Sequence, residues 1–270
     1  MTGRYIHTAL GRIYVDIAGS GEPILLLPSL LTDHTLFAAQ IRHFGDRYTT
    51  IAVDPPGQGG SAHLHRQFSF EESADCYLRI LDELAIPRAH IIGNSWGAMI
   101  GGTLAATHPD RVACAILING TASPAPAWDR RKLALSAHLS RRLGRMAFPR
   151  TLVVPRFLGA TTIRERPELV DDFLTILARN NPRSAGFAVQ SIVVNRPDQH
   201  ALFTRIHSPV LIITGSEDIS FPIPEVRRMA RAIPGAEFAV LDHIGHLAAY
   251  EAPEVVNRLA ADFLTRHDPA

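Results

Sequence analysis

Short apolar stretches alternate with helical patterns along most of this 270-residue chain, and the alternation restricts the folds that are open to it. A strand buried in a parallel sheet is apolar on both faces, whereas a helix repeats its apolar positions every three or four residues. The strand-like stretches are residues 13–17, 24–27, 49–53, 89–92, 112–118, 210–213 and 237–241. The helical patterns are residues 33–44, 70–84, 95–107, 224–232 and 253–263. This order predicts an α/β fold with a mostly parallel sheet flanked by helices.

The alternation stops at residues 123–126, which contain two prolines, and resumes near residue 198. Between them the chain shows helical patterns and few strand-like runs. One pattern places four apolar side chains on a single stripe, which predicts a buried helix face. These are Leu135, Leu139, Leu143 and Met146. We therefore expect a core of residues 1–123 and 198–270, and a helical cap inserted at residues 124–197.

Charge and composition argue against several classes of partner. Lysine and arginine total 27 against 26 acidic residues, so the net charge of +1 offers no general attraction to nucleic acid or to an anionic membrane. The longest apolar run, residues 112–118, is far shorter than the roughly 18 residues of a membrane span. The 13 histidines lack metal-ligand spacing. We expect a cytoplasmic protein without metal or cofactor, acting on a small molecule, and leave a homo-oligomer open.

A candidate nucleophile lies in the motif Gly93-Asn94-Ser95-Trp96-Gly97. The motif follows a predicted buried strand and begins a helix of small residues, which is the setting that gives a Gly-x-Ser-x-Gly pattern meaning. A serine at such a sharp turn has strained backbone and leaves no room for a Cβ two residues away on either side. The helix N-terminus also offers free N–H groups to an oxyanion. Ser95 is therefore the predicted nucleophile.

A serine hydroxyl needs a base, and the base needs a third group to orient it. Asp218 follows the strand-like stretch 210–213, at the sheet edge where open α/β folds gather their catalytic groups. His243 and His246 both follow the next stretch, 237–241. The chain thus supplies an acid and a base downstream of the serine, with two histidines open as the base.

Together these motifs resemble those of the α/β-hydrolase superfamily, over essentially the whole chain. Members commonly carry the histidine in a Gly-His pair followed by a Glu-x-Pro helix start, which matches residues 245–246 and 251–253. Residues 215–222 match their Gly-x-x-Asp-x-x-x-Pro stretch. Residues 54–61 are similar to their Asp-x-x-Gly-x-Gly-x-Ser loop, in which we interpret Asp54 as a structural brace. The resemblance implies a catalytic triad of Ser95, His246 and Asp218.

The loop after residues 24–27 departs from the superfamily's pattern, because Pro28-Ser29 replaces the usual His-Gly. The amide of Leu30 can still donate a hydrogen bond, and with the amide of Trp96 it would complete an oxyanion hole. Residues 29–37 resemble a stretch found in 3-oxoadipate enol-lactonases and their close relatives. This resemblance implies a small ester or lactone as substrate, and we assign Ser29 to substrate binding.

Four aromatic side chains of the predicted cap are candidates for lining a substrate pocket, although they could equally form the cap's own core. They are Trp128, Phe148, Phe157 and Phe187. Helical spacing also places Arg130, Arg141 and Arg145 on one face, opposite the leucine stripe. Because the chain holds 26 arginines and one lysine, we interpret this face as solvated rather than as an anion site.

The sequence thus predicts a serine hydrolase of small carboxylic esters or lactones. Ser95 would attack the carbonyl, His246 would transfer the proton, and Asp218 would orient the imidazole, with no cofactor. Two alternatives stay open. One is hydrolysis of a carbon–carbon bond in a ring-cleavage product, since superfamily members with that activity often carry the same Gly-Asn-Ser turn. The other is a non-hydrolytic ligand receptor that has kept the triad.

Overall fold

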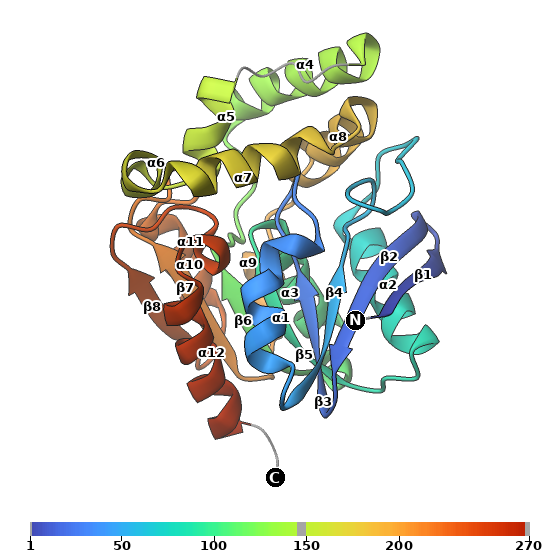
Figure 1. Ribbon diagram of the computed structural model, residues 1–270, viewed down its shortest axis with the longest axis vertical. Coiled ribbons are helices and arrows are strands. Elements are labelled where there is room, and N and C mark those ends of the chain that lie inside the picture. Colours follow the sequence, from blue (N-terminus) through green and yellow to red (C-terminus); the bar gives the residue numbers. More distant parts are fainter. Residues whose placement is uncertain (1, 145–149, 268–270) are drawn as a thin grey trace.

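The computed structural model describes residues 2–144 and 150–267. Its centre is an eight-stranded sheet in the order β1-β2-β4-β3-β5-β6-β7-β8 (Figure 1). The strands are β1 (Thr2–Thr8), β2 (Gly11–Gly19), β3 (Glu22–Leu27), β4 (Tyr48–Val53), β5 (Ala89–Asn94), β6 (Val112–Ile118), β7 (Val210–Gly215) and β8 (Glu237–Leu241). Adjacent strands from β4 to β8 in this order run parallel. At the opposite edge of the sheet, β2 pairs antiparallel with both β1 and β4. The predicted α/β fold is confirmed, but β1, whose side chains are mostly exposed, was not predicted.

Helices cover both faces of the sheet. They are η1 (His34–Phe37), α1 (Ala38–Phe44), α2 (Phe70–Glu83), α3 (Trp96–Thr107), η2 (Pro109–Arg111), α9 (His200–Phe203), α10 (Ile223–Ala232), α11 (Ala248–Glu251) and α12 (Pro253–His267). Strand β3 shows how the sheet divides the core: Ile24 and Leu26 belong to the cluster that contains α1 and α12, whereas Leu25 and Leu27 face α2, α3 and α10. Side chains alternate along a strand, so a wholly apolar strand supplies both cores.

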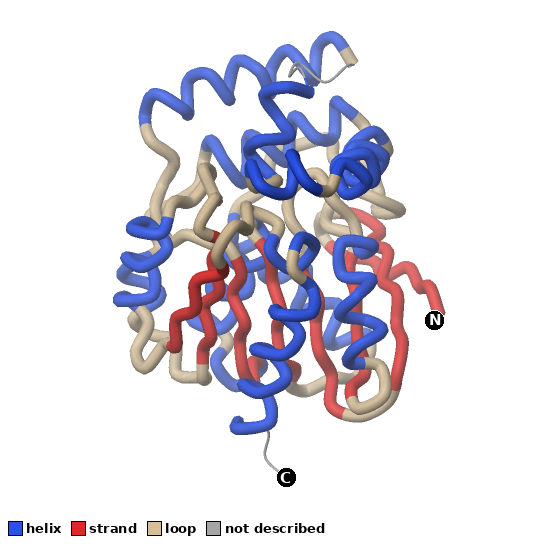
Figure 2. The backbone as a smooth tube through the Cα atoms, turned by 60° about the vertical axis from the view of Figure 1, so that its left-hand side comes forward, coloured by secondary structure: helices blue, strands red, loops and turns tan. Residues whose placement is uncertain are grey.

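The segment between β6 and β7 is helical and stacks over one end of the sheet (Figures 1 and 2). We call residues 124–197 the inserted segment. Its helices are α4 (Ala127–Leu143), α5 (Arg150–Phe157), α6 (Ala160–Glu165), α7 (Pro167–Ala178), α8 (Pro182–Val189) and the π-helix η3 (Gln190–Val194). The segment leaves the sheet at the C-terminal end of β6. It therefore covers the end of the sheet at which the parallel strands β5, β7 and β8 also finish.

The leucine stripe predicted to be buried on α4 is exposed, which corrects the sequence interpretation. Leu135 is 61% exposed and Leu143 55% exposed. Small residues, among them Ala137 and Ser140, form the buried face instead. The reason is close packing against α8: a Cβ on Gly186 would lie 2.7 Å from the carbonyl oxygen of Ala137, so only small side chains fit between these helices. Met146 lies outside the described residues.

Among residues 2–144 and 150–267, the helices are too short or too polar for any of them to traverse a lipid bilayer.

Candidate active site

Ser95 lies at the turn between β5 and α3 with a backbone conformation that few side chains adopt, φ 55° and ψ −109°. The flanking glycines make this turn possible. A Cβ on Gly97 would lie 1.8 Å from the carbonyl oxygen of Leu27, and a Cβ on Gly93 would lie 2.4 Å from the backbone of Gly97. The turn therefore presses two backbone segments together and holds the serine at the end of the sheet.

The structure brings the three predicted catalytic side chains into one hydrogen-bonded chain. The Nε2 atom of His246 lies 2.7 Å from Ser95 Oγ, and its Nδ1 atom lies 2.8 Å from Asp218 Oδ2. All three side chains are buried. His243, the other histidine considered, projects into solvent with 76% of its side chain exposed and pairs loosely with Glu217 at 3.7 Å. The geometry suits proton transfer from the serine hydroxyl to His246, and it leaves His243 aside.

Asn119, which sequence reasoning missed, holds the acid in place. It follows β6 with a left-handed backbone, φ 49°. Its side-chain amide donates to Asp218 Oδ2 at 2.9 Å and to the carbonyl oxygen of Gly245 at 3.2 Å. The other oxygen, Asp218 Oδ1, accepts from the amides of Ser220 and Phe221. An asparagine directly after a strand is the signal that could have pointed to this residue, because asparagine tolerates the left-handed region.

Asn94, inside the nucleophile motif, is a second residue that sequence reasoning left without a role. Its side-chain amide donates to the carbonyl oxygen of His246 at 3.0 Å, and its side-chain oxygen faces the amide of Ala249 at 3.5 Å. The side chain is fully buried. Asn94 therefore joins the serine turn to the backbone of the histidine loop.

The two predicted oxyanion donors both line the cavity in front of Ser95. The amides of Leu30 and Trp96 have no partner among the loop and turn hydrogen bonds of the described residues. The side chain of Ser29 differs from our expectation: it is fully buried, it lies outside the cavity lining, and its hydroxyl finds no partner in the described chain. The backbone carbonyl of Ser29 instead accepts from the Thr32 hydroxyl at 2.8 Å. Of this loop, Leu30 and Leu31 line the cavity, whereas Ser29 does not.

The cavity has a volume of about 420 Å³ and lies between the sheet edge and the inserted segment. Most of its lining is apolar, as in sites for small organic ligands. Phe157 lines it and packs 6.0 Å from the His246 ring, and Phe221, which was not predicted, packs 5.1 Å from the same ring. Phe148 and the Trp128 side chain lie outside the described residues.

Phe187 does not reach this cavity. It lines a separate pocket on α8, where the guanidinium of Arg141 lies 5.1 Å from its ring centroid. Arg141 also donates to the carbonyl oxygen of Gly186 at 3.5 Å and is half-buried. Arg141 is therefore only partly solvated, because its guanidinium lies over an aromatic ring, whereas Arg130 on the same predicted face is exposed.

Two carboxylates join the inserted segment to the loops that carry the acid and the base. Glu217 accepts from the amide and the hydroxyl of Thr161, both at 2.7 Å. Burial alone would raise the pKa of Glu217, but these hydrogen bonds hold it below the ordinary value. Glu251 accepts from the amides of Gly159 at 2.9 Å and Leu247 at 3.2 Å. For Glu251 burial dominates and raises the pKa.

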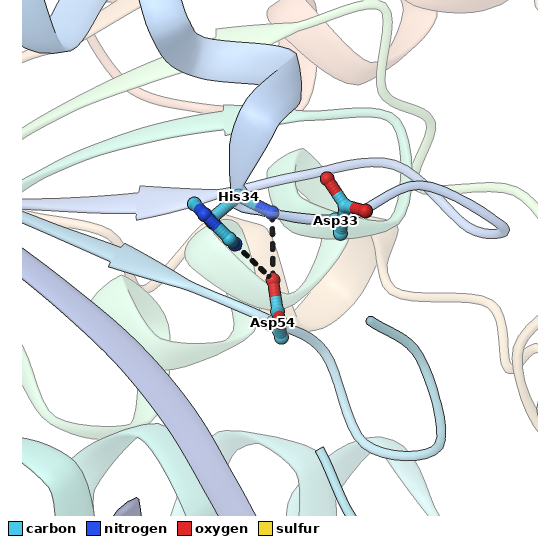
Figure 3. Close-up of side chains that lie close together, drawn as sticks. All are labelled: Asp33, His34 and Asp54. Carbon is cyan, nitrogen blue, oxygen red and sulfur yellow. Dashed lines mark hydrogen bonds and ion pairs between the residues drawn. The ribbon is translucent and has the colours of Figure 1, made fainter. Parts of the chain in front are cut away.

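Asp33, His34 and Asp54 lie close together, near enough for their ligand atoms to hold a cation (Figure 3). Hydrogen bonds already account for the arrangement. Asp54 Oδ1 accepts from the backbone amide of His34 at 2.8 Å and lies 2.7 Å from its Nδ1 atom, while Oδ2 accepts from Gly60 at 2.6 Å. Asp33 caps helix η1 by accepting from Thr35. Asp54 is thus the structural brace expected from its loop.

Comparison with known proteins agrees with this architecture. A family model described as the alpha/beta hydrolase fold matches residues 22–253. RutD of Caulobacter vibrioides, which is named for carbamate hydrolysis, is 27% identical over 249 residues. The match covers 92% of this chain and 91% of RutD. The 3-oxoadipate enol-lactonase 2 of Acinetobacter baylyi is 27% identical over 256 residues, and the match covers 94% of this chain and 92% of the lactonase. A thermophilic esterase from Thermogutta terrifontis, solved with malate bound, superposes with a TM-score of 0.91 at 25% identity, covering 100% of both chains.

Proposed function

We propose that this chain, which belongs to the alpha/beta hydrolase fold family, is a serine hydrolase that cleaves a small carboxylic ester or lactone. The observation that carries the proposal is the continuous chain of contacts from Ser95 through His246 to Asp218, with Ser95 and His246 lining a mainly apolar cavity. The relatives named as an enol-lactonase and an esterase support the same substrate class.

In the proposed mechanism Ser95 Oγ attacks the substrate carbonyl while His246 Nε2 takes its proton. Asp218 holds the imidazole in orientation and stabilises its cationic form. The amides of Leu30 and Trp96 donate to the oxyanion. His246 then returns the proton to the leaving alcohol, and a water molecule repeats the sequence to release the acid and restore Ser95.

The inserted segment acts in this proposal as the cap that selects the substrate. It lines one side of the cavity and supplies Phe157 beside the base, so it limits both water access and the size of the acyl group. A cavity of about 420 Å³ suits a compact substrate rather than a long acyl chain.

Covalent labelling with a fluorophosphonate, together with turnover of 4-nitrophenyl acetate and of simple lactones, tests the proposal. The wild-type protein should be labelled at Ser95 and should hydrolyse the ester. The Ser95→Ala and His246→Ala variants should each lose on the order of 10⁴-fold in kcat, because triad members act as a unit. Retention of more than about a tenth of wild-type turnover by Ser95→Ala would remove the nucleophile assignment. Binding of esters without any turnover by the wild-type protein would instead favour a ligand receptor.

A further inference from the structure

One positively charged side chain is buried in the wall of the otherwise mainly apolar cavity. Arg196, which follows η3 where the inserted segment returns to the core, is only 8% exposed and lines the same cavity as Ser95 and His246. Lys132 and Arg156 also line the cavity but are exposed. No aspartate or glutamate occurs among the described residues of the lining. The cavity in front of the nucleophile is therefore cationic.

The two terminal nitrogens of the Arg196 guanidinium have no hydrogen-bond partner among the described residues. Its Nε atom donates to the carbonyl oxygen of Ser123 at 2.6 Å. Within residues 2–144 and 150–267, no carboxylate forms an ion pair with Arg196. Glu225 influences its charge only from a longer distance, and burial lowers the pKa of Arg196 to about 10. The side chain is still a cation at neutral pH, and no carboxylate of the described residues contacts it directly.

Phe221 packs against both the buried cation and the base. The guanidinium carbon of Arg196 lies 5.1 Å from the centroid of the Phe221 ring, and the same ring lies 5.1 Å from the His246 ring. A single aromatic ring thus links the buried cation and the base. Both side chains and Ser95 contact the same cavity, so a ligand of modest length can reach the nucleophile and the guanidinium together.

We propose that Arg196 binds a carboxylate carried by the substrate, so that the ester or lactone cleaved at Ser95 is anionic. The proposal rests on the proposed hydrolase function and narrows its substrate class. A guanidinium presents its donors as a planar fork that matches a carboxylate, and pairing would supply the missing countercharge in the cavity wall. Arg141, in contrast, lines the other pocket and not the cavity in front of Ser95.

Two matched ester pairs test the proposal, because within each pair only a carboxylate replaces a methyl group. Monomethyl glutarate against methyl pentanoate places the charge on the acyl chain. 4-Acetoxybenzoate against 4-methylphenyl acetate places it on the leaving group. For at least one pair, Arg196→Met should lower the charged-to-neutral ratio of kcat/KM by about tenfold or more, since hydrogen bonds between charged groups are the strong ones. Arg196→Lys, which keeps the charge but loses the fork, should lose less.

The control is Arg164→Met, which removes an exposed arginine that pairs with Glu165 outside the cavity and should leave both ratios unchanged. A purely structural role for Arg196, through its bond to the Ser123 carbonyl, would lower kcat/KM equally for both members of a pair, and that result overturns the proposal. Unchanged ratios in both pairs overturn it as well. In either case Ser95-dependent turnover of the neutral esters would leave the hydrolase function standing.

A binding measurement separates the two proposals completely. Glutarate titrated calorimetrically into the Ser95→Ala variant needs no turnover. Adding Arg196→Met to that variant should weaken glutarate binding by about tenfold or more, whereas adding Arg164→Met should not change it. Equal glutarate affinity with and without Arg196, or no binding at all, would contradict the carboxylate site even if esters were hydrolysed.

Discussion

Replacing Asn119 by glycine tests whether the acid of the triad is held by the residue that sequence reasoning missed. Glycine adopts the φ of 49° found there without strain, so the variant removes the side-chain amide alone. That amide donates to the same oxygen, Asp218 Oδ2, that lies against His246. A hydrogen bond to a charged group contributes about 1.5–3 kcal/mol. If this hydrogen-bond energy is lost from the transition state and not from the bound substrate, kcat should drop by roughly 10- to 100-fold.

The assay is steady-state hydrolysis of 4-nitrophenyl acetate, with the melting temperature measured in parallel. We expect kcat to fall much more than KM changes, because Asn119 contacts the acid and not the cavity. Asn119→Ala should show the same kinetic loss with a lower melting temperature, since alanine is strained at positive φ. In a variant that already carries Asp218→Ala, removing Asn119 should change kcat less than about twofold, because the contact with the acid is already lost and only the bond to the Gly245 carbonyl remains. Independent, additive losses would refute this reasoning, as would full activity of Asn119→Gly.

Three further outcomes follow from the same structure. Phe157→Ala should change the kcat/KM ratio between short- and long-chain esters by more than about tenfold, since methylene-sized changes in an apolar pocket are worth about 1–3 kcal/mol, and Phe187→Ala should not. His243→Ala should lose less than about tenfold in kcat, because its side chain is exposed and only one imidazole can bridge the serine and the acid. Burial alone would lower the pKa of His34, but Asp54 raises it overall, so the protonated imidazole stabilises the fold. This stabilisation should be complete below about pH 6.5 and be lost as the pH rises through the raised pKa, giving a urea midpoint that falls with pH more in the wild type than in His34→Asn.

The sheet and the turn that carries Ser95 were predictable because strong local constraints mark them, whereas the choice of His246 over His243 came from the family resemblance. Wholly apolar runs have few alternatives to buried strands, and the glycines around Ser95 are required by contacts of 1.8 and 2.4 Å that would exclude any Cβ. The strand β1 carries no such mark, because its side chains are mostly exposed and the antiparallel pairing to β2 supplies its stability.

The inserted segment was harder to predict because helical periodicity identifies an apolar stripe but not its neighbour. On α4 the leucines lie outward, since Gly186 on α8 approaches so closely that only small residues fit beneath. Phe187 was predicted to line the substrate cavity because its side chain is apolar. The orientation of α8 directs that side chain into another pocket. Arg196 carried no sequence signal, because burial is what distinguishes it from the other arginines whose side chains the structure describes.

The contacts of Glu217 and Glu251 connect substrate selection to catalysis. Glu217 directly precedes the acid of the triad and binds the start of α6, while Glu251 binds Gly159 in the inserted segment and the amide that follows His246. A displacement of α6 therefore acts on both loops that position the imidazole. Because near-attack geometry is sensitive to shifts of about 1 Å, the inserted segment can influence kcat as well as KM without touching the serine. Arg196 lies where the same segment rejoins the core and donates to the carbonyl of Ser123 where the segment begins, so a carboxylate bound there would lie at the base of the inserted segment.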